Sequence, residues 1–164
     1  MRTEIKQKLR KWFGCLFVIY LCGFAAFVAY DYIVNEPKTK LILTRLEKEF
    51  NQIQALPQAK TIKVNRSHKP RQALVGGTYS TTLDFGEIRK YYDKELEEHG
   101  WHFINEEAVR DWGRDFGGRI AHYRKSDYTA SLQYAGDPKE YGWAYGLDLT
   151  WRLSFRESLA WDGR

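Results

Sequence analysis

A run of nineteen residues without a charge, Trp12 to Tyr30, constrains this chain more than any other feature. Five basic residues come immediately before it: Arg2, Lys6, Lys8, Arg10 and Lys11. Because a bilayer core of about 30 Å needs about 20 mostly apolar residues in a helix, the run is long enough to cross a membrane. We therefore expect a transmembrane helix over residues 12–34, preceded by a basic cytoplasmic tail over residues 1–11.

The charges on either side of the run predict its orientation. Lys and Arg near a membrane segment are retained on the cytoplasmic side, and here the basic segment precedes the run whereas Asp31 and Glu36 follow it. We therefore expect an inner (cytoplasmic) membrane protein whose C-terminal domain, residues 37–164, lies in the periplasm or outside the cell. A cleaved signal peptide is the alternative, with Gly23-Phe24-Ala25 as a loose cleavage site. The apolar run continues past that site to Tyr30, which favours a retained span.

The composition of residues 37–164 limits the chemistry of the outer domain. The only two cysteines, Cys15 and Cys22, lie in the predicted span, so the domain has no disulfide, no cysteine nucleophile and no thiolate metal ligand. A segment of this length can bury an adequate core as a single domain. Its 21 basic and 18 acidic residues are too balanced to indicate nucleic acid as a partner.

The first helix expected in the outer domain follows the span directly. Apolar residues recur three and four positions apart: Leu43, Leu46, Phe50 and Ile53. This spacing places them on one face of an amphipathic helix, which Pro37 and Pro57 bracket. We expect this helix to leave the membrane and pack on the domain. The alternative is a solvated stalk that continues the span.

A second helix is predicted from Phe85 to His99. Asp84 and Glu87 have the spacing of a capping box, and Gly100 supplies a C-terminal stop. The apolar stripe that this helix would bury consists of Phe85, Ile88, Tyr92 and Leu96.

The rest of the domain has the pattern of strands and turns. We predict strands at residues 61–65, 73–83, 101–105, 119–125, 128–134 and 143–155, with a loop over residues 66–71. Gly76-Gly77 interrupts the second of these and indicates a bulge or a close backbone approach. The last strand has apolar residues at every second position from Trp143 to Phe155, which specifies one buried face. The predicted fold class is α+β: a transmembrane helix followed by a two-layer sandwich of an antiparallel sheet with two helices.

One short pattern resembles a known group of proteins. The run from Tyr91 to Trp101 has the form Tyr-Tyr-x3-Leu-x3-Gly-Trp, and it is similar to a pattern in small membrane-anchored or lipid-anchored bacterial proteins, most without assigned activity. The resemblance covers the junction between the second helix and the strand that follows it. It implies a bacterial envelope protein with a compact binding-type domain, and it transfers no catalytic residue.

The sequence gives little support to metal or nucleophilic chemistry. The four histidines are His68, His99, His102 and His122, and none of them forms a pair at the helical spacing of a metal site. The serines lack the context of a nucleophile elbow, and the chain has no phosphate-binding glycine loop. We predict no cofactor and no metal.

The segment from Arg110 to Arg119 is the first candidate for partner contact. It combines aromatics, arginines, carboxylates and glycines, as is typical of a loop that meets a partner. The candidate residues are Arg110, Trp112, Arg114, Phe116 and Arg119. Asp111 and Asp115 have the chemistry of an acid/base pair or of calcium ligands, although a calcium loop usually supplies more oxygen ligands. The alternative is an ordinary hairpin loop stabilised by local ion pairs.

A basic cluster over residues 60–71 is the second candidate. It consists of Lys60, Lys63, Arg66, His68, Lys69 and Arg71, without an acidic residue among them. Such a cluster attracts anionic lipid headgroups or an acidic protein surface. The partner-binding candidates are Arg66, His68, Lys69 and Arg71. A solvated loop whose charges balance Glu95, Glu97 and Glu98 is the alternative.

We expect a non-enzymatic, single-span envelope protein whose outer domain binds another protein. An immunity-type protein that captures a toxin, or an accessory subunit of a membrane complex, would fit this expectation. The alternative is a hydrolase acting on an envelope polymer or lipid, with Asp111, Asp115, Glu106 or His122 in its site. Two carboxylates in one cleft with shifted pKa values would favour the hydrolase, whereas an aromatic and arginine surface would favour binding.

Overall fold

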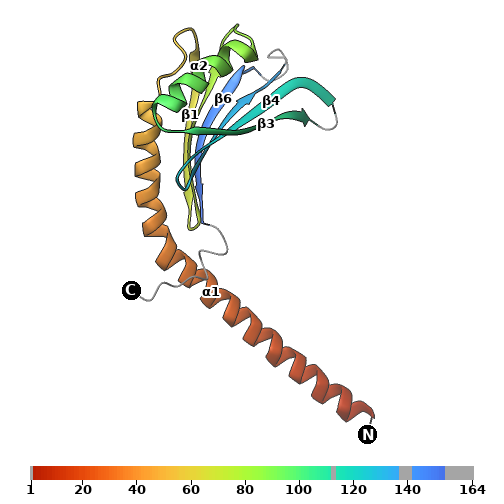
Figure 1. Cartoon of the computed structure of the whole chain (residues 1–164). Helices are drawn as coiled ribbons and strands as arrows, with labels where there is room; N and C mark the ends of the chain where they lie inside the picture. The colour runs from red at the N-terminus through yellow and green to blue at the C-terminus, as the bar shows by residue number, and fades with distance from the viewer. Residues whose placement is uncertain (1, 112–113, 137–141, 154–164) are drawn as a thin grey trace.

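The computed structural model describes residues 2–111, 114–136 and 142–153, and its first element is one long helix, α1, from Arg2 to Gln52. The expectation that Pro37 separates two helices is wrong, because Pro37 lies inside α1. Proline removes one backbone hydrogen bond and kinks a helix, which need not end there when packing supports it. Figure 1 shows α1 bending between the half that stands free and the half beside the sheet.

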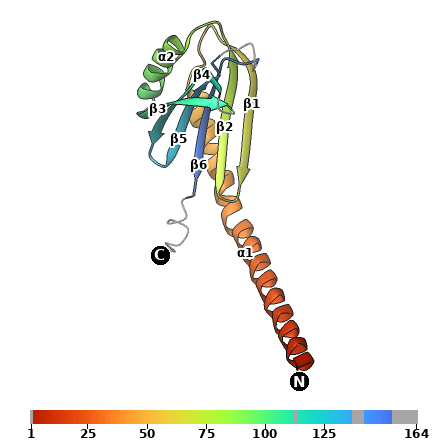
Figure 2. The ribbon, with the colours of Figure 1, turned by 90° about the vertical axis from the view of Figure 1, so that its right-hand side faces the viewer.

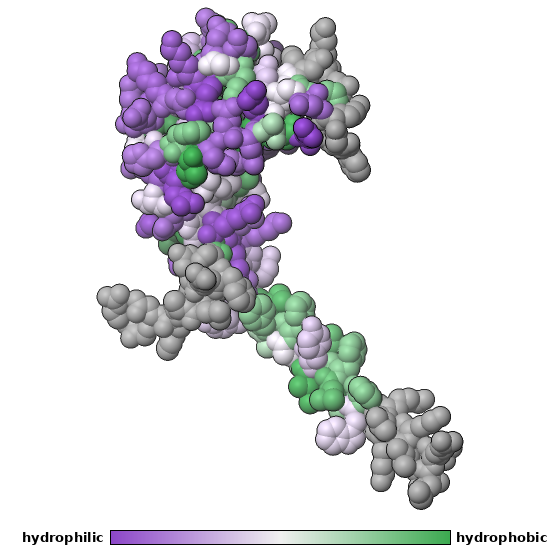
Figure 3. All heavy atoms as spheres, turned by 45° about the vertical axis from the view of Figure 1, so that its right-hand side comes forward, coloured by the Kyte–Doolittle hydropathy of each residue, from purple (hydrophilic) through white to green (hydrophobic). Residues whose placement is uncertain are grey.

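The first half of α1 is long and apolar enough to cross a membrane. Its large apolar side chains, from Trp12 to Val34, are exposed. Figure 3 shows this apolar stretch standing clear of the polar surface of the domain. The α+β architecture and one possible membrane-crossing helix therefore agree with the sequence prediction.

A six-stranded antiparallel sheet follows α1, and its strand order is β1-β2-β6-β5-β4-β3. The strands are β1 Lys60–Lys69, β2 Gln72–Ser80, β3 His102–Asp111, β4 Arg114–Lys125, β5 Tyr128–Tyr134 and β6 Tyr145–Arg152. One further helix, α2 Phe85–Glu98, separates β2 from β3. The predicted hairpin around Ser126-Asp127 is confirmed as the connection between β4 and β5.

Two details of the strand prediction are wrong, and a third, the bulge or close approach predicted at Gly76-Gly77, is confirmed as a close approach. The predicted loop over residues 66–71 is mostly strand, because β1 continues to Lys69. The described residues of the segment from Arg110 to Arg119 belong to the end of β3 and the start of β4, and Asp111 pairs with Arg114. The pairing of β2 with β6 is unbroken through Gly76 and Gly77, so these glycines mark a close approach and no bulge. An added Cβ at Gly76 would lie 1.7 Å from Asp148 Oδ1.

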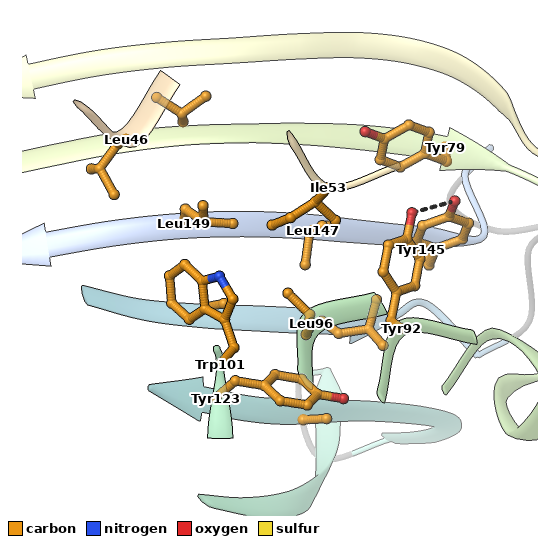
Figure 4. Packing of buried hydrophobic residues seen from close by; sticks show 14 of the residues in the cluster. Leu46, Ile53, Tyr79, Tyr92, Leu96, Trp101, Tyr123, Tyr145, Leu147 and Leu149 are labelled. Atoms are coloured by element: carbon orange, nitrogen blue, oxygen red, sulfur yellow. Dashed lines mark hydrogen bonds between the residues drawn. The ribbon is translucent and has the colours of Figure 1, made fainter. Parts of the chain in front are cut away.

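The core lies between one face of the sheet and the two helices, and we call this face the covered face. Fully buried apolar residues come from all three sources: Leu46 of α1, Ile88 and Leu96 of α2, and Leu147 and Leu149 of β6. Figure 4 shows Leu46 and Ile53 above Leu147 and Leu149, with Tyr92 and Tyr145 meeting at one end. Burying a leucine side chain contributes about 1.5–3 kcal/mol, so the second half of α1 is a structural part of the domain.

Helix α2 begins and ends as its sequence predicts. The backbone N–H of Glu87 donates to Asp84 Oδ1 over 2.9 Å, and the N–H of Asp84 donates to Glu87 Oε2 over 3.2 Å. These two bonds form a capping box, which satisfies donors that the first turn leaves free. Gly100 takes a φ of +79° just past the helix, a conformation that glycine adopts without strain.

The turn between β1 and β2 is fixed against α1 beside the apolar half. The buried Thr39 hydroxyl lies 2.8 Å from the carbonyl oxygens of both Asn35 and Pro70. Arg71 Nε donates to Asp31 Oδ1 over 2.7 Å, and its guanidinium lies 5.6 Å from the centre of the Phe27 ring. Since Phe27 belongs to the apolar run, this turn is the part of the domain nearest to the predicted span.

Two leucines of α1 test whether its second half is a core helix or a stalk. Leu46 is fully buried, whereas Leu41 is 66% exposed on the same helix. We expect Leu46→Ala to lower the free energy of unfolding by about 2–5 kcal/mol, because it leaves a cavity. Leu41→Ala should change it by less than about 0.5 kcal/mol. Urea denaturation of the full-length protein in detergent measures both, and equally small effects would show that α1 does not belong to the core.

Candidate functional site

The two helices leave one face of the sheet uncovered, and we call it the open face. Figure 2 looks onto this face and has α1 behind the strands. The end of the β3–β4 hairpin projects away from α1 on this side (Figure 1).

A cavity of about 250 Å³ lies where this hairpin meets the ends of β5 and β6, and we call it the distal pocket. Its lining includes Val109, Arg110, Phe116, Gln133, Tyr134 and Trp143. The opposite end of β6 pairs with β2 beside Arg71, which contacts α1. The distal pocket thus lies at the end of the sheet away from the apolar half of α1.

A glycine makes the distal pocket possible. Gly136 follows β5 with a φ of +85°, and an added Cβ would lie 2.0 Å from the carbonyl oxygen of Phe116. Only a residue without a side chain lets the two segments approach this closely. The position of Phe116 in the pocket therefore depends on Gly136.

The candidate residues of the segment from Arg110 to Arg119 lie in different parts of the structure. Arg110 and Phe116 both line the distal pocket. Arg119 instead lies beside α2 on the covered face, where its Nη1 is 3.0 Å from Glu106 Oε1 and its guanidinium is 5.9 Å from the Phe85 ring centre. Trp112 and the side chain of Arg114 lie outside the described residues.

Of the two aspartates predicted as candidates in the same segment, only Asp115 has a described side chain. Asp115 is exposed, and its Oδ1 accepts the backbone N–H of Gly117 over 2.9 Å, which shapes the hairpin. The side chain of Asp111 lies outside the described residues. The contact of Asp115 agrees with the simpler interpretation of this carboxylate as a hairpin residue.

The basic cluster lies along α1, whose carboxylates pair with it. Arg66 is 3.4 Å from Glu47, His68 is 3.8 Å from Glu36, and Arg71 is 2.7 Å from Asp31. Lys69 is exposed at the end of β1, next to the turn that contacts α1. Three of the four predicted partner-binding residues therefore contact α1 from β1 and from the β1–β2 turn, and His68 and Arg71 do so near the end of the predicted span.

A row of polar side chains crosses the centre of the open face, and sequence reasoning did not find it. Ser131 Oγ lies 3.3 Å from His122 Nδ1, and His122 Nε2 lies 3.2 Å from Glu107 Oε1. Asp148 pairs with Ser131 in the neighbouring strand, opposite Gly76. The signal was available, because Asp148 stands between small and apolar residues in the alternating strand β6.

The carboxylate of Asp148 is perturbed by its surroundings. Burial raises the pKa of Asp148 above the ordinary aspartate value. Among the described residues it has no hydrogen bond or ion pair that would offset this burial. A polar row with a half-buried carboxylate is a feature of binding and catalytic surfaces alike.

Glu106 and His122 of the predicted hydrolase site lie on opposite faces of the sheet. Glu106 lies on the covered face with Ala121, bonded to Arg89 Nη1 over 2.6 Å and to Arg119. His122 lies on the open face. Within the described part of the chain, no group of three or more His, Cys, Asp or Glu side chains is placed to hold a metal ion.

The pattern from Tyr91 to Trp101 has a structural explanation. Tyr92, Leu96 and Trp101 are buried in the core, and Gly100 ends α2. The Tyr91 hydroxyl lies 3.3 Å from the carbonyl oxygen of Gln54 at the end of α1.

No protein-family model, curated protein or solved structure matches this chain.

Asp148 generates a prediction on pH dependence. Because its folded-state pKa is raised, the folded chain binds this proton more tightly than the unfolded chain, and stability falls as pH rises from about 3.9 through the folded pKa. At pH 7 the charged carboxylate therefore opposes folding. We expect Asp148→Asn to raise the free energy of unfolding at pH 7, and the gain should shrink below about pH 4.

Urea denaturation at a series of pH values measures this difference. Asp127→Asn, in the exposed β4–β5 turn, is the control and should leave the free energy of unfolding near that of the wild type. A loss of stability in Asp148→Asn at pH 7 would show that the carboxylate has a partner that stabilises its charged form.

Proposed function

We propose that this protein is a single-pass membrane protein of the bacterial envelope whose outer domain binds another protein through the distal pocket. The observation that carries the proposal is a pocket lined by Arg110, Phe116 and Trp143 at the end of the sheet away from the apolar helix. A partner approaching from the aqueous side would meet this end first.

The continuity of α1 supports retention of the span. The helix continues through Gly23-Phe24-Ala25 without a break and then contributes Leu46 to the core. The apolar run and the domain are thus parts of one element. The basic residues before the run support a cytoplasmic N terminus and an outer domain.

The size and lining of the distal pocket favour a protein over a small molecule. Sites for small molecules usually measure about 300–1,000 Å³, and this cavity of about 250 Å³ suits one or two side chains of a partner. Aromatic residues and arginine supply most of the binding energy at protein interfaces. Tyr134, Phe116 and Trp143 would form the anchor region, and Arg110 would supply a cation at its rim.

Two versions of this function share the same surface. In an immunity-type version, the domain is held at the membrane and captures a toxin that acts in the envelope. In the other version, the domain is an accessory subunit that docks on a membrane complex. Both need a pocket that points away from the bilayer.

The row Ser131, His122 and Glu107 is the observation that most favours the alternative, a hydrolase. It resembles a serine, histidine and carboxylate chain, but Ser131 stands in the middle of β5, between β4 and β6. The backbone N–H groups around a central strand residue are used in sheet pairing, so they do not stabilise an oxyanion. We therefore prefer binding over hydrolysis.

The test is co-purification of the full-length protein from its native membrane in detergent. Arg110→Ala with Phe116→Ala should lose a stoichiometric partner, because the change removes an anchor and a rim cation, each worth about 1 kcal/mol or more. Arg66→Ala with Lys69→Ala, on the edge strand near α1, is the matched control and should keep the partner.

Mass spectrometry identifies the partner, and binding of the purified pair gives the affinities. Loss of the partner in the control but not in the pocket variant would place the interface on the basic cluster and contradict the proposal. A wild-type preparation without any partner, combined with hydrolysis of an envelope polymer or lipid, would favour the alternative function.

A further inference from the structure

A second cavity lies at the other end of the domain, where α1 leaves the sheet, and we call it the juxtamembrane groove. It measures about 400 Å³. Its lining includes Lys38, Leu41 and Arg45 of α1, Asp127 and Tyr128 at the β4–β5 turn, and Trp151 of β6. These residues combine cations with apolar and aromatic surface.

The groove lies close to the expected surface of the bilayer. Lys38 follows Val34, the end of the predicted span, by about 6 Å along the helix axis. The polar headgroup layer is about 5–8 Å thick on each side of a bilayer, so Lys38 is within or beside it. The backbone N–H of Leu153, at the β6 end of the groove, donates to the carbonyl of Arg71 over 3.0 Å. Arg71 in turn contacts Asp31 and Phe27, which brings this end of the sheet to the same level.

The cations of the groove are available for a ligand. Lys38, Leu41 and Arg45 are three and four residues apart, so they lie on one side of α1. Among the described residues, neither Lys38 nor Arg45 forms an ion pair, whereas Arg66 and Arg71 pair with carboxylates of α1. Asp127 is the one carboxylate among the described residues that line the groove.

The groove also has an apolar part. Leu41 is 66% exposed although it lies beside the core residue Ile42. Tyr128 and Trp151 also line the groove. An apolar side chain between two cations suits a ligand that has an anionic group and a hydrocarbon part.

We propose that the juxtamembrane groove binds one anionic phospholipid of the membrane that α1 crosses. Lys38 and Arg45 would bind the phosphate, and Leu41, about 10 Å beyond Val34 along the helix, would contact the glycerol and ester part of the lipid rather than the acyl chains in the bilayer core. Asp127 would accept a hydrogen bond from a headgroup hydroxyl, as phosphatidylglycerol offers. The inference rests on the proposed span, and it adds a lipid site that is separate from the distal pocket.

Native mass spectrometry of the full-length protein in detergent tests this proposal. The protein is incubated with equal amounts of phosphatidylglycerol and phosphatidylcholine, and the bound lipid is counted. Detergent removes the general attraction of a charged bilayer, so only a built site retains the anionic lipid. We expect one phosphatidylglycerol to be bound in preference to phosphatidylcholine.

Two variants with the same net charge separate the groove from the rest of α1. Lys38→Gln with Arg45→Gln should weaken retention by about fivefold for each side chain changed. Lys40→Gln with Lys48→Gln removes two exposed cations of the same helix that do not line the groove, and retention should stay within about twofold of the wild type. All four residues are exposed, so neither variant disturbs the core.

The results that would contradict the lipid site differ from the result that would contradict the predicted span. No preference for phosphatidylglycerol in the wild type, or equal losses in the two variants, would contradict a lipid site in the groove. The intact mass in the same experiment reports whether residues 12–34 are retained. A mass that lacks these residues would contradict the proposed span itself.

Discussion

The packing of the second half of α1 on the sheet is the interaction on which the rest of the structure depends. Leu46 and Ile42 of this helix are buried against the covered face, and the same helix carries the exposed apolar run toward its N-terminal end. A separate stalk would leave the domain free to turn on a linker. Here the contacts of Thr39 and Arg71 fix the β1–β2 turn to α1 as well. The direction of the sheet relative to the apolar half is therefore set by side-chain packing.

This arrangement gives the domain two different ends. The end beside Phe27 and Asp31 has the basic edge strand and the juxtamembrane groove, and its chemistry suits anionic headgroups. The other end has the distal pocket, with aromatic side chains and Arg110, and its chemistry suits a protein. The function proposed above needs both: one end that lies on the bilayer and one that is accessible from water.

Elements with strong local signals were predicted correctly from the sequence. The predictions were wrong for elements whose structure depends on contacts between segments far apart in the chain. The capping box of Asp84 and Glu87 and the alternation along β6 are local, and both predictions are confirmed. Pro37 was expected to end a helix, but packing of α1 on the sheet carries the helix through it. The loop expected at residues 66–71 is largely strand, because residues 66–69 pair with β2 in an antiparallel ladder. No local signal shows packing between segments far apart in the chain.

The candidate site was predicted in part for the same reason. Arg110 and Phe116 were identified from the composition of one segment, and they do share a pocket. Arg119, from the same segment, lies on the other face, since strand alternation reverses the direction of its side chain. The row of Glu107, His122, Ser131 and Asp148 comes from four strands, and the register that aligns them depends on the whole sheet.

The most direct test of this account measures the depth of two labelled positions in a reconstituted bilayer. Spin labels are placed at Lys69→Cys, beside the turn that contacts α1, and at Asp115→Cys, near the distal pocket, after Cys15 and Cys22 are changed to serine. Collision rates with oxygen and with a water-soluble nickel complex report the depth of each label. The account predicts that the label at position 69 lies in the headgroup layer and that the label at position 115 lies in water, well away from the bilayer. Equal depths, or a label at position 115 nearer to the bilayer, would contradict a domain fixed by α1 with its pocket facing away from the membrane.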